Sequence, residues 1–237
     1  MAPFSSTTAV LLAAPQLIGY IRGALYAAGF AVIDVPAVSA LGIKLAGFQI
    51  CLLCYTVAFV LDVVDGKVAR ILNQTSQLGG VLDMVVDRSA TAALLTVLAG
   101  AYPSFRLHFA FLVSLDVGSH WMHVASCQLR PDGGHHKAAD TLERRNVLLR
   151  LYYGIYPLFG YCCVCTEAFY ILLLALAYAP DASFQLGSAA ATVRLVDVTW
   201  YLCFPACVLK NIVNLMQLWS GTVALAELDT PLYQKRS

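Results

Sequence analysis

The sequence predicts an all-α, polytopic membrane protein that folds as a six-transmembrane-helix bundle. Of its 237 residues, 59% are hydrophobic and 12% are charged, whereas soluble domains average about 45–50% apolar and 25% charged residues. A bilayer core about 30 Å thick needs roughly 20 apolar residues for each helical span. Six apolar segments reach or approach that length, at residues 17–33, 45–65, 80–102, 107–129, 151–178 and 195–220. We therefore expect one transmembrane domain over residues 1–237, with short tails at 1–14 and 222–237.

Turn-forming residues separate these segments where a helical bundle needs breaks. They occur at Asp34-Val35-Pro36, Ala101-Tyr102-Pro103-Ser104, Pro131-Asp132-Gly133-Gly134 and Ala179-Pro180-Asp181. The first eight residues lack the basic stretch of a secretory signal, so we expect a retained tail.

The basic residues are distributed unevenly between the two sides of such a bundle. With six spans, both termini share a side with the connections 66–79 and 130–150. Eleven basic residues fall on that side and three on the other, while Lys210 lies inside the last segment: Arg22, Lys67, Arg70, Arg88, Arg130, Lys137, Arg144, Arg145, Arg150, Lys235 and Arg236, against Lys44, Arg106 and Arg194. The positive-inside rule therefore places both termini in the cytosol.

Two further features of the composition exclude other classes of protein. The net charge is +1 and the basic residues are scattered, so no nucleic-acid partner is expected. Cys51 and Cys54 form a CxxC that resembles half a zinc site, but no second CxxC stands at a partner spacing. We interpret most of the eight cysteines as small packing residues in a reduced setting.

Four aspartates form the main candidate site. Asp62 and Asp65 are three residues apart at the end of the second segment, and Asp83 and Asp87 are four apart at the start of the third. Each pair therefore shares a helical face, and the two faces converge if the helices pack antiparallel. Charged side chains at membrane depth are costly and indicate function. One or two Mg²⁺ or Mn²⁺ ions would neutralise four converging carboxylates, and oxygen ligands favour such hard cations over zinc.

The residues between the aspartates suggest that the site binds phosphate. Gly66 and Gly79 allow close approach of a ligand, and the guanidinium of Arg70 can bind a phosphate or diphosphate through two nitrogens. The whole motif reads Asp62-x2-Asp65-Gly66-x2-Ala69-Arg70-x8-Gly79-x3-Asp83-x3-Asp87. The alternative is purely structural, with the acids held as buried ion pairs by Arg70 and Arg88.

All eight positions of this motif match those of the CDP-alcohol phosphotransferase family, which the chain closely resembles. These membrane enzymes transfer a phosphate-linked group from a CDP-activated donor to an alcohol. The resemblance implies that Asp62, Asp65 and Asp83 hold the metal at the donor diphosphate, and that Asp87 lies at the metal site and acts as general base. It also implies homodimers, a cytosol-facing site and CDP-diacylglycerol binding by Gly66, Ala69, Arg70, Gly79 and Arg22.

Other stretches resemble the eukaryotic members of this family whose acceptor is myo-inositol. They include residues 17–22, 73–74, 114–123, 136–137 and 149–153, and the similarity runs from about residue 15 to 220. It implies an endoplasmic reticulum enzyme that makes phosphatidylinositol and CMP. One departure is Gln16, where relatives commonly carry asparagine after the proline, so a contact to the nucleotide end of the donor is altered.

The residues of the fourth segment are compatible with a polyol pocket. Asp116 lies near its middle, and His120 follows one turn later on the same face. Inositol is neutral and carries six hydroxyls, so its recognition needs several fixed donors and acceptors. We assign Asp116, His120, Lys137 and Arg150 to this pocket, although His120 alone also fits an interior histidine. Lys210 either lines a substrate cavity or extends to the membrane interface.

The predicted reaction is attack by an inositol hydroxyl on the β-phosphorus of CDP-diacylglycerol, with Asp87 as the base. The nearest alternative is the same chemistry on glycerol 3-phosphate, serine or another alcohol. An ion-coupled transporter is the alternative from a different class, because intramembrane carboxylates also mark cation pathways. It predicts inverted repeats and paired broken helices, which the sequence does not show.

Overall fold

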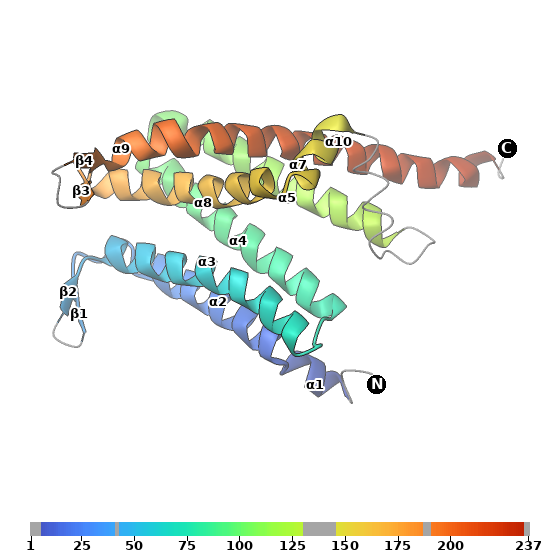
Figure 1. Cartoon of the computed structure of the whole chain (residues 1–237), viewed down its shortest axis with the longest axis horizontal. Coiled ribbons are helices and arrows are strands. Elements are labelled where there is room, and N and C mark those ends of the chain that lie inside the picture. Colours follow the sequence, from blue (N-terminus) through green and yellow to red (C-terminus); the bar gives the residue numbers. More distant parts are fainter. Residues whose placement is uncertain (1–5, 41–42, 130–145, 187–190, 235–237) are drawn as a thin grey trace. The chain divides into compact units, whose positions relative to one another are not determined.

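The computed structural model describes residues 6–40, 43–129, 146–186 and 191–234. Most of these residues are helical (Figure 1). The chain divides into two compact units, Met1–Ala93 and Leu94–Ser237. Each unit is described on its own below.

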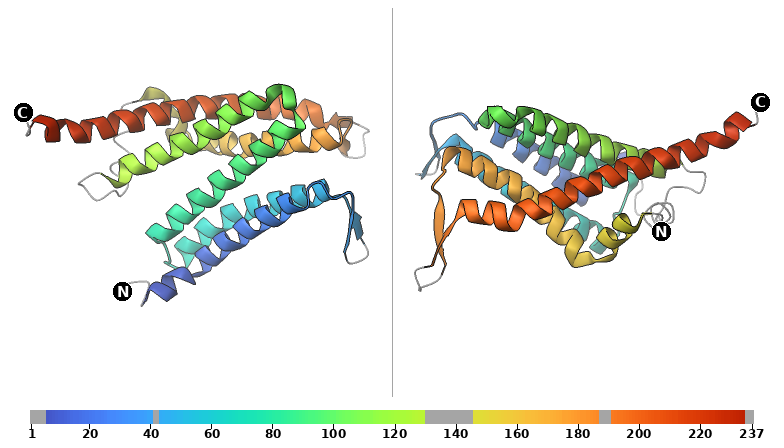
Figure 2. Two further views of the ribbon diagram at one scale, coloured as in Figure 1. Left: turned by 180° about the vertical axis from the view of Figure 1, so that it is seen from behind. Right: turned by 90° about the horizontal axis from the view of Figure 1, so that it is seen from above.

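The first unit is a helical hairpin joined to a third helix. Helices α2 and α3 lie side by side along most of their length (Figure 2). A two-stranded antiparallel hairpin connects them, with Val38 opposite Leu45. The elements in order are α1 (Thr7–Leu11), α2 (Ala14–Ala31), β1 (Val38–Ala40), β2 (Ile43–Leu45), α3 (Gly47–Ile71) and the first part of α4 (Gln77–Ala101).

Glycines allow α2 and α3 to pack closely. A Cβ atom on Gly29 would lie 3.0 Å from the Cβ of Cys54 and 3.3 Å from the Cα of Cys51. At Gly47 it would lie 1.8 Å from the carbonyl oxygen of Val32, so no other residue fits there. Cys51 is 1% exposed. The cysteine pair therefore lies in a packed helix interface, in keeping with its interpretation as packing residues.

A tight turn returns the chain from α3 to α4. Asn73 has a φ of 52°, the left-handed conformation that asparagine tolerates after a helix end. The amide of Gln74 donates to the carbonyl of Ala69 at 2.8 Å, which closes the last turn of α3. Ser76 then caps α4, because its hydroxyl accepts a hydrogen bond from the amide of Gly79 at 3.0 Å. The turn thus brings the end of α3 next to the start of α4.

The second unit packs its last helix, α10, against α5 and α8. Leu149, Tyr152, Cys162 and Val213 are buried together in its core. A second antiparallel hairpin pairs Ser183 with Arg194. The elements after α4 are η1 (Pro103–Phe105), α5 (Arg106–Gln128), α7 (Val147–Gly154), α8 (Tyr156–Tyr178), β3 (Ser183–Leu186), β4 (Ala191–Arg194), α9 (Leu195–Asp197), η2 (Val198–Cys203) and α10 (Phe204–Gln234).

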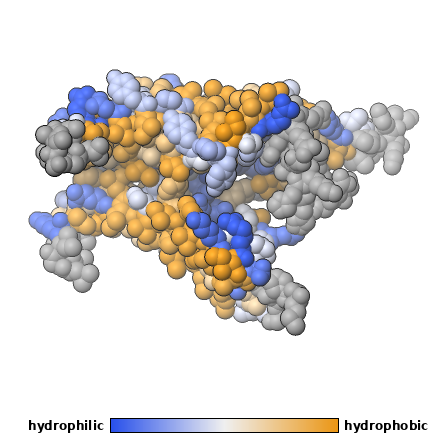
Figure 3. Space-filling model, in the orientation of Figure 1, coloured by the Kyte–Doolittle hydropathy of each residue, from blue (hydrophilic) through white to orange (hydrophobic). Residues whose placement is uncertain are grey.

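The described residues form six helices of 18 to 31 residues, α2, α3, α4, α5, α8 and α10, one for each predicted segment. Three described helices, Gly47–Ile71, Tyr156–Tyr178 and Leu195–Thr230, are long and apolar enough to cross a membrane. Hydrophobic side chains cover much of the face seen in Figure 3. On α3, Leu53 and Val60 are more than half exposed, which suits a lipid environment. The protein is therefore a helical membrane protein, and the count of six spans stays a prediction.

The structure differs from the predicted helix pattern in several places, including the short helix α1 within the predicted tail at 1–14. The two β-hairpins were not predicted, because each strand is only three or four residues long. The segment 151–178 is broken at Ile155, whose ψ of 86° is not helical and which precedes Pro157 in the first turn of α8. Helix α10 continues through Gln234, so most of the predicted tail at 222–237 is helical.

Candidate active site

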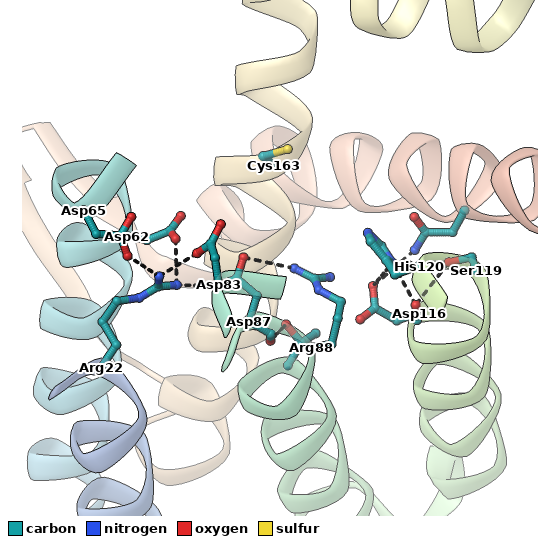
Figure 4. Close-up of polar contacts among 12 residues, drawn as sticks. Arg22, Asp62, Asp65, Asp83, Asp87, Arg88, Asp116, Ser119, His120 and Cys163 are labelled. Atoms are coloured by element: carbon teal, nitrogen blue, oxygen red, sulfur yellow. Dashed lines mark hydrogen bonds and ion pairs between the residues drawn. The ribbon is translucent and has the colours of Figure 1, made fainter. Parts of the chain in front are cut away.

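The four aspartates of the motif converge within the first unit. Asp62 and Asp65 lie in the second half of α3, and Asp83 and Asp87 lie in the first half of α4 (Figure 4). Oxygen atoms of Asp62, Asp83 and Asp87 lie within 4.8 Å of one another. The structure therefore brings the two acidic faces together as the spacing predicted.

Arg22 of α2 lies at the centre of these carboxylates (Figure 4). Its Nη1 is 2.6 Å from Oδ2 of Asp65 and 2.7 Å from Oδ1 of Asp83. Its Nη2 is 2.6 Å from Oδ1 of Asp62 and also bonds Oδ1 of Asp87. Each terminal nitrogen thus bridges one carboxylate of α3 and one of α4.

These contacts differ from those expected if the acids were only structural ion pairs. That interpretation paired them with Arg70 and Arg88, but the arginine that contacts all four is Arg22. Arg88 approaches Asp87 with Nη2 3.6 Å from Oδ2. The guanidinium of Arg70 lies over Gly66, where an added Cβ would be 3.5 Å from its Nη1.

The carboxylate oxygens fit a divalent cation. A magnesium ion binds oxygen ligands at about 2.0–2.1 Å, so ligands on opposite sides of one ion are about 4.2 Å apart. The oxygens of Asp62, Asp83 and Asp87 lie within 4.8 Å of one another, which is close to this spacing. One guanidinium faces four carboxylates, so the site retains an excess of acidic groups that further positive charge would stabilise.

A cavity of about 230 Å³ opens beside the carboxylates within the same unit. Asp65 and Asp83 line it, together with four of the five residues assigned to the donor: Gly66, Ala69, Arg70 and Gly79. Arg22, the fifth, is not among the described residues that line the cavity, and its assignment to the donor stays a prediction.

Gln16 and Ser76 also line this cavity. The amide Nε2 of Gln16 donates to the hydroxyl of Ser76 at 2.7 Å. Its Oε1 is buried and accepts no hydrogen bond from the described part of the chain. Gln16 therefore presents its side chain to the predicted donor site.

A second polar cluster lies in the second unit, around Asp116 and His120 of α5. Nδ1 of His120 is 2.8 Å from the carbonyl oxygen of Asp116, which can only accept a hydrogen bond. In a neutral imidazole Nδ1 therefore carries the proton and Nε2 is an acceptor. The hydroxyl of Ser119 also donates to the Asp116 carbonyl.

Asn214 completes this cluster and was missed in the sequence. Its Nδ2 donates to Oδ1 of Asp116 at 3.3 Å, from 98 residues away along the chain. Its Oδ1 is buried and accepts no hydrogen bond from the residues that the structure describes. A signal was available: Asn211, Asn214 and Gln217 form a polar stripe in the apolar helix α10, three residues apart.

The other residues assigned to the acceptor are less closely tied to this cluster. Lys137 lies outside the described residues. Arg150 is an exposed residue of α7, and its assignment stays a prediction. Nζ of Lys210 lies 5.7 Å from the ring centroid of Tyr152, a cation–π contact inside the second unit.

Comparison with known proteins identifies the family. The sequence profile of the CDP-alcohol phosphatidyltransferase family matches residues 12–130, which include the whole aspartate motif. No solved structure gives a significant match.

Relatives with assigned names extend over most of the chain, and all three described here are named CDP-diacylglycerol–inositol 3-phosphatidyltransferase. The chain is 35% identical to that of Schizosaccharomyces pombe over 189 residues, which cover 76% of this chain and 78% of the relative. It is 34% identical to that of Rattus norvegicus over 220 residues, covering 93% and 94%. It is 33% identical to enzyme 1 of this name from Arabidopsis thaliana over 238 residues, which cover 98% of this chain and 97% of the relative. This chain therefore belongs to the CDP-alcohol phosphatidyltransferase family.

Proposed function

We propose that this protein transfers the phosphatidyl group of CDP-diacylglycerol to myo-inositol, giving phosphatidylinositol and CMP. The observation that carries the proposal is the convergence of four carboxylates from α3 and α4 beside a cavity lined by Gly66, Ala69, Arg70 and Gly79. The relatives that cover most of the chain carry the name of this activity.

The donor binds in the cavity of the first unit. Gly66 and Gly79 leave room for the diphosphate and nucleotide, since neither carries a side chain that would fill the cavity. The guanidinium of Arg70 supplies a planar pair of donors for phosphate oxygens. Gln16, held by Ser76, faces the same cavity and contacts the nucleotide end of the donor.

The carboxylates supply the remaining chemistry. Asp62, Asp65, Asp83 and Asp87 would hold Mg²⁺ or Mn²⁺, which acts as a Lewis acid toward the diphosphate. Asp87 accepts the proton of the inositol hydroxyl as the oxygen of that hydroxyl attacks the β-phosphorus. The bond from that phosphorus to the oxygen of CMP breaks, and the proton remains on Asp87 until it reaches solvent.

Asp116, His120 and Asn214 form the acceptor site, with Lys137 and Arg150 as further predicted contacts. Asp116 and Nε2 of His120 accept hydrogen bonds, and Asn214 presents a buried oxygen acceptor. Such an array suits a neutral polyol, because several hydroxyl donors can be satisfied at once. A phosphorylated acceptor would require convergent basic residues instead.

The enzyme works in the endoplasmic reticulum membrane as a six-span homodimer with both termini and the site on the cytosolic side. The excess of basic residues on the predicted cytosolic side supports this orientation. This side also suits the substrates, because the acyl chains of the donor stay in the bilayer while inositol arrives from water.

A transfer assay on the purified protein tests the proposal. Labelled CDP-diacylglycerol is offered with inositol, serine or glycerol 3-phosphate in turn, in the presence of Mg²⁺, Mn²⁺ or chelator. We expect labelled phosphatidylinositol, and an equal amount of CMP, only when both inositol and a divalent ion are present. Product with serine or glycerol 3-phosphate but not with inositol would show that inositol is not the acceptor. Full activity in chelator would show that the reaction does not depend on a divalent metal. Cation-coupled flux of a substrate across proteoliposomes, without CMP release, would favour the transporter.

A further inference from the structure

We propose that Arg22 is a positioning residue that clamps the four aspartates into their metal-binding arrangement. It contacts one oxygen of each carboxylate and so fixes where the four acidic groups lie relative to one another. The inference rests on the proposed metal site and adds a residue that acts on the metal through its ligands.

The two terminal nitrogens of Arg22 join α3 to α4. Nη1 contacts Asp65 and Asp83, and Nη2 contacts Asp62 and Asp87. Because the guanidinium is planar and rigid, it sets the distance between the two pairs as well as within each pair. The ammonium group of a lysine has one nitrogen on a flexible side chain, so it would hold four separate oxygens less well.

The clamp is buried, whereas three of the carboxylates that it holds are partly exposed. The side chain of Arg22 is fully buried, whereas that of Asp83 is 47% exposed and those of Asp62 and Asp87 are each 28% exposed. The arginine therefore reaches the carboxylates from the protein interior. The exposed parts of the carboxylates remain open to a cation from solvent, and Asp65 and Asp83 also line the cavity.

Helix α2 is shaped to place the arginine there. Gly19 and Gly23 flank Arg22 and face α4, where an added Cβ would lie 3.1 Å from Cδ2 of Leu82 and 4.0 Å from Cγ2 of Val86. Burying a guanidinium is costly unless it is paired. The Nε of Arg22 has no hydrogen-bond partner in the described chain, so the contacts to the aspartates are what stabilise the charge.

The clamp and simple charge compensation predict opposite effects on metal binding. If Arg22 were only a counter-ion, removing its charge would strengthen cation binding, because the carboxylates would be left more negative. If Arg22 positions the ligands, its removal weakens metal binding, because the carboxylates repel one another and separate. Loss of a hydrogen-bonding partner behind a metal ligand typically lowers metal affinity by about 10–100-fold.

Mn²⁺ binding to the purified full-length protein in detergent tests this, with wild type, Arg22→Lys and Arg22→Gln compared by titration calorimetry. Arg88→Gln is the matched control, because it also removes one positive charge, and Arg88 approaches Asp87, its neighbour in α4, at 3.6 Å. We expect Mn²⁺ affinity to fall about 10-fold or more in both Arg22 variants and to stay the same or rise in the control. Unchanged affinity in Arg22→Lys together with tighter binding in Arg22→Gln would overturn the clamp.

Two further outcomes separate the clamp from the proposed function. If wild type does not bind Mn²⁺, the metal site and the clamp both fail. If wild type binds Mn²⁺ and the Arg22 variants bind equally well, the clamp alone fails. Should Arg22→Gln unfold in chelator, Arg22→Lys alone decides: affinity about 10-fold or more below that of the wild type supports the clamp, and unchanged affinity overturns it.

Discussion

The side chain of Gln16 donates a hydrogen bond to the hydroxyl of Ser76 at 2.7 Å. The same hydroxyl accepts the amide of Gly79 at 3.0 Å and so caps α4. One oxygen atom therefore holds the start of α4 and a side chain of α2 at the wall of the donor cavity.

Replacing Ser76 by alanine should weaken donor binding and the fold together. Loss of an N-cap costs about 0.5–2 kcal/mol of stability, and the freed Gln16 side chain no longer has a fixed position. We expect the KM for CDP-diacylglycerol to rise several-fold while the KM for inositol is unchanged. Ser114→Ala is the control, since that hydroxyl donates to Ala110 within α5. An unchanged donor KM would show that this bond does not shape the donor site.

Replacing Asp87 by asparagine should abolish turnover while leaving most donor binding intact. A positioned base contributes about 10²–10⁴-fold, and the amide cannot accept the hydroxyl proton. Turnover is measured by CMP release, and donor binding by equilibrium titration with CDP-diacylglycerol. Complete loss of donor binding would instead make Asp87 an obligatory metal ligand.

Changing the acceptor cluster should affect inositol more than the lipid donor. Asp116→Ala and Asn214→Leu each remove hydrogen-bonding groups of this cluster, so both should raise the KM for inositol with little change in the donor KM. Asn211→Ala serves as the control, because Asn211 lies one turn earlier and donates to the carbonyl of Cys207 at 2.8 Å and to the hydroxyl of Tyr170 at 3.4 Å. Equal changes for both substrates would exclude Asp116 and Asn214 from the acceptor site.

The interface between α2 and α3 should tolerate no added bulk at Gly29. Gly29→Val would press against Cys54 and the backbone of Cys51, and overpacking typically costs about 1–3 kcal/mol. Gly100→Ala is the counterpart in α4, where no atom lies within 4 Å of the added Cβ, and it should be neutral or stabilising by up to about 1 kcal/mol. Thermal unfolding in detergent measures both. A similar Tm for the two variants would contradict the close packing.

The sequence alone predicted the convergence of the four carboxylates, because the geometry that brings them together is local. Helical periodicity puts Asp62 with Asp65 and Asp83 with Asp87, and a short turn is enough to bring the pairs together. The left-handed Asn73 and the Ser76 cap that make this turn were not anticipated, although both residue types are typical of helix ends.

Contacts between distant segments were not predictable in the same way. Arg22 was assigned to the donor from the family resemblance, and nothing in its own neighbourhood shows that α2 packs beside α3 through Gly29 and Gly47. Asn214 lies 98 residues from Asp116, so the polar stripe of α10 could be recognised but its partner could not. Both contacts depend on tertiary packing, which periodicity does not encode.

The division of the chain near Ala93 has a consequence for how such enzymes diversify. The aspartates, Arg22 and the cavity all belong to the segment before this point, whereas Asp116, His120 and Asn214 follow it. Substitutions in the later segment can therefore alter the proposed acceptor site while the segment with the proposed donor and metal site is inherited intact.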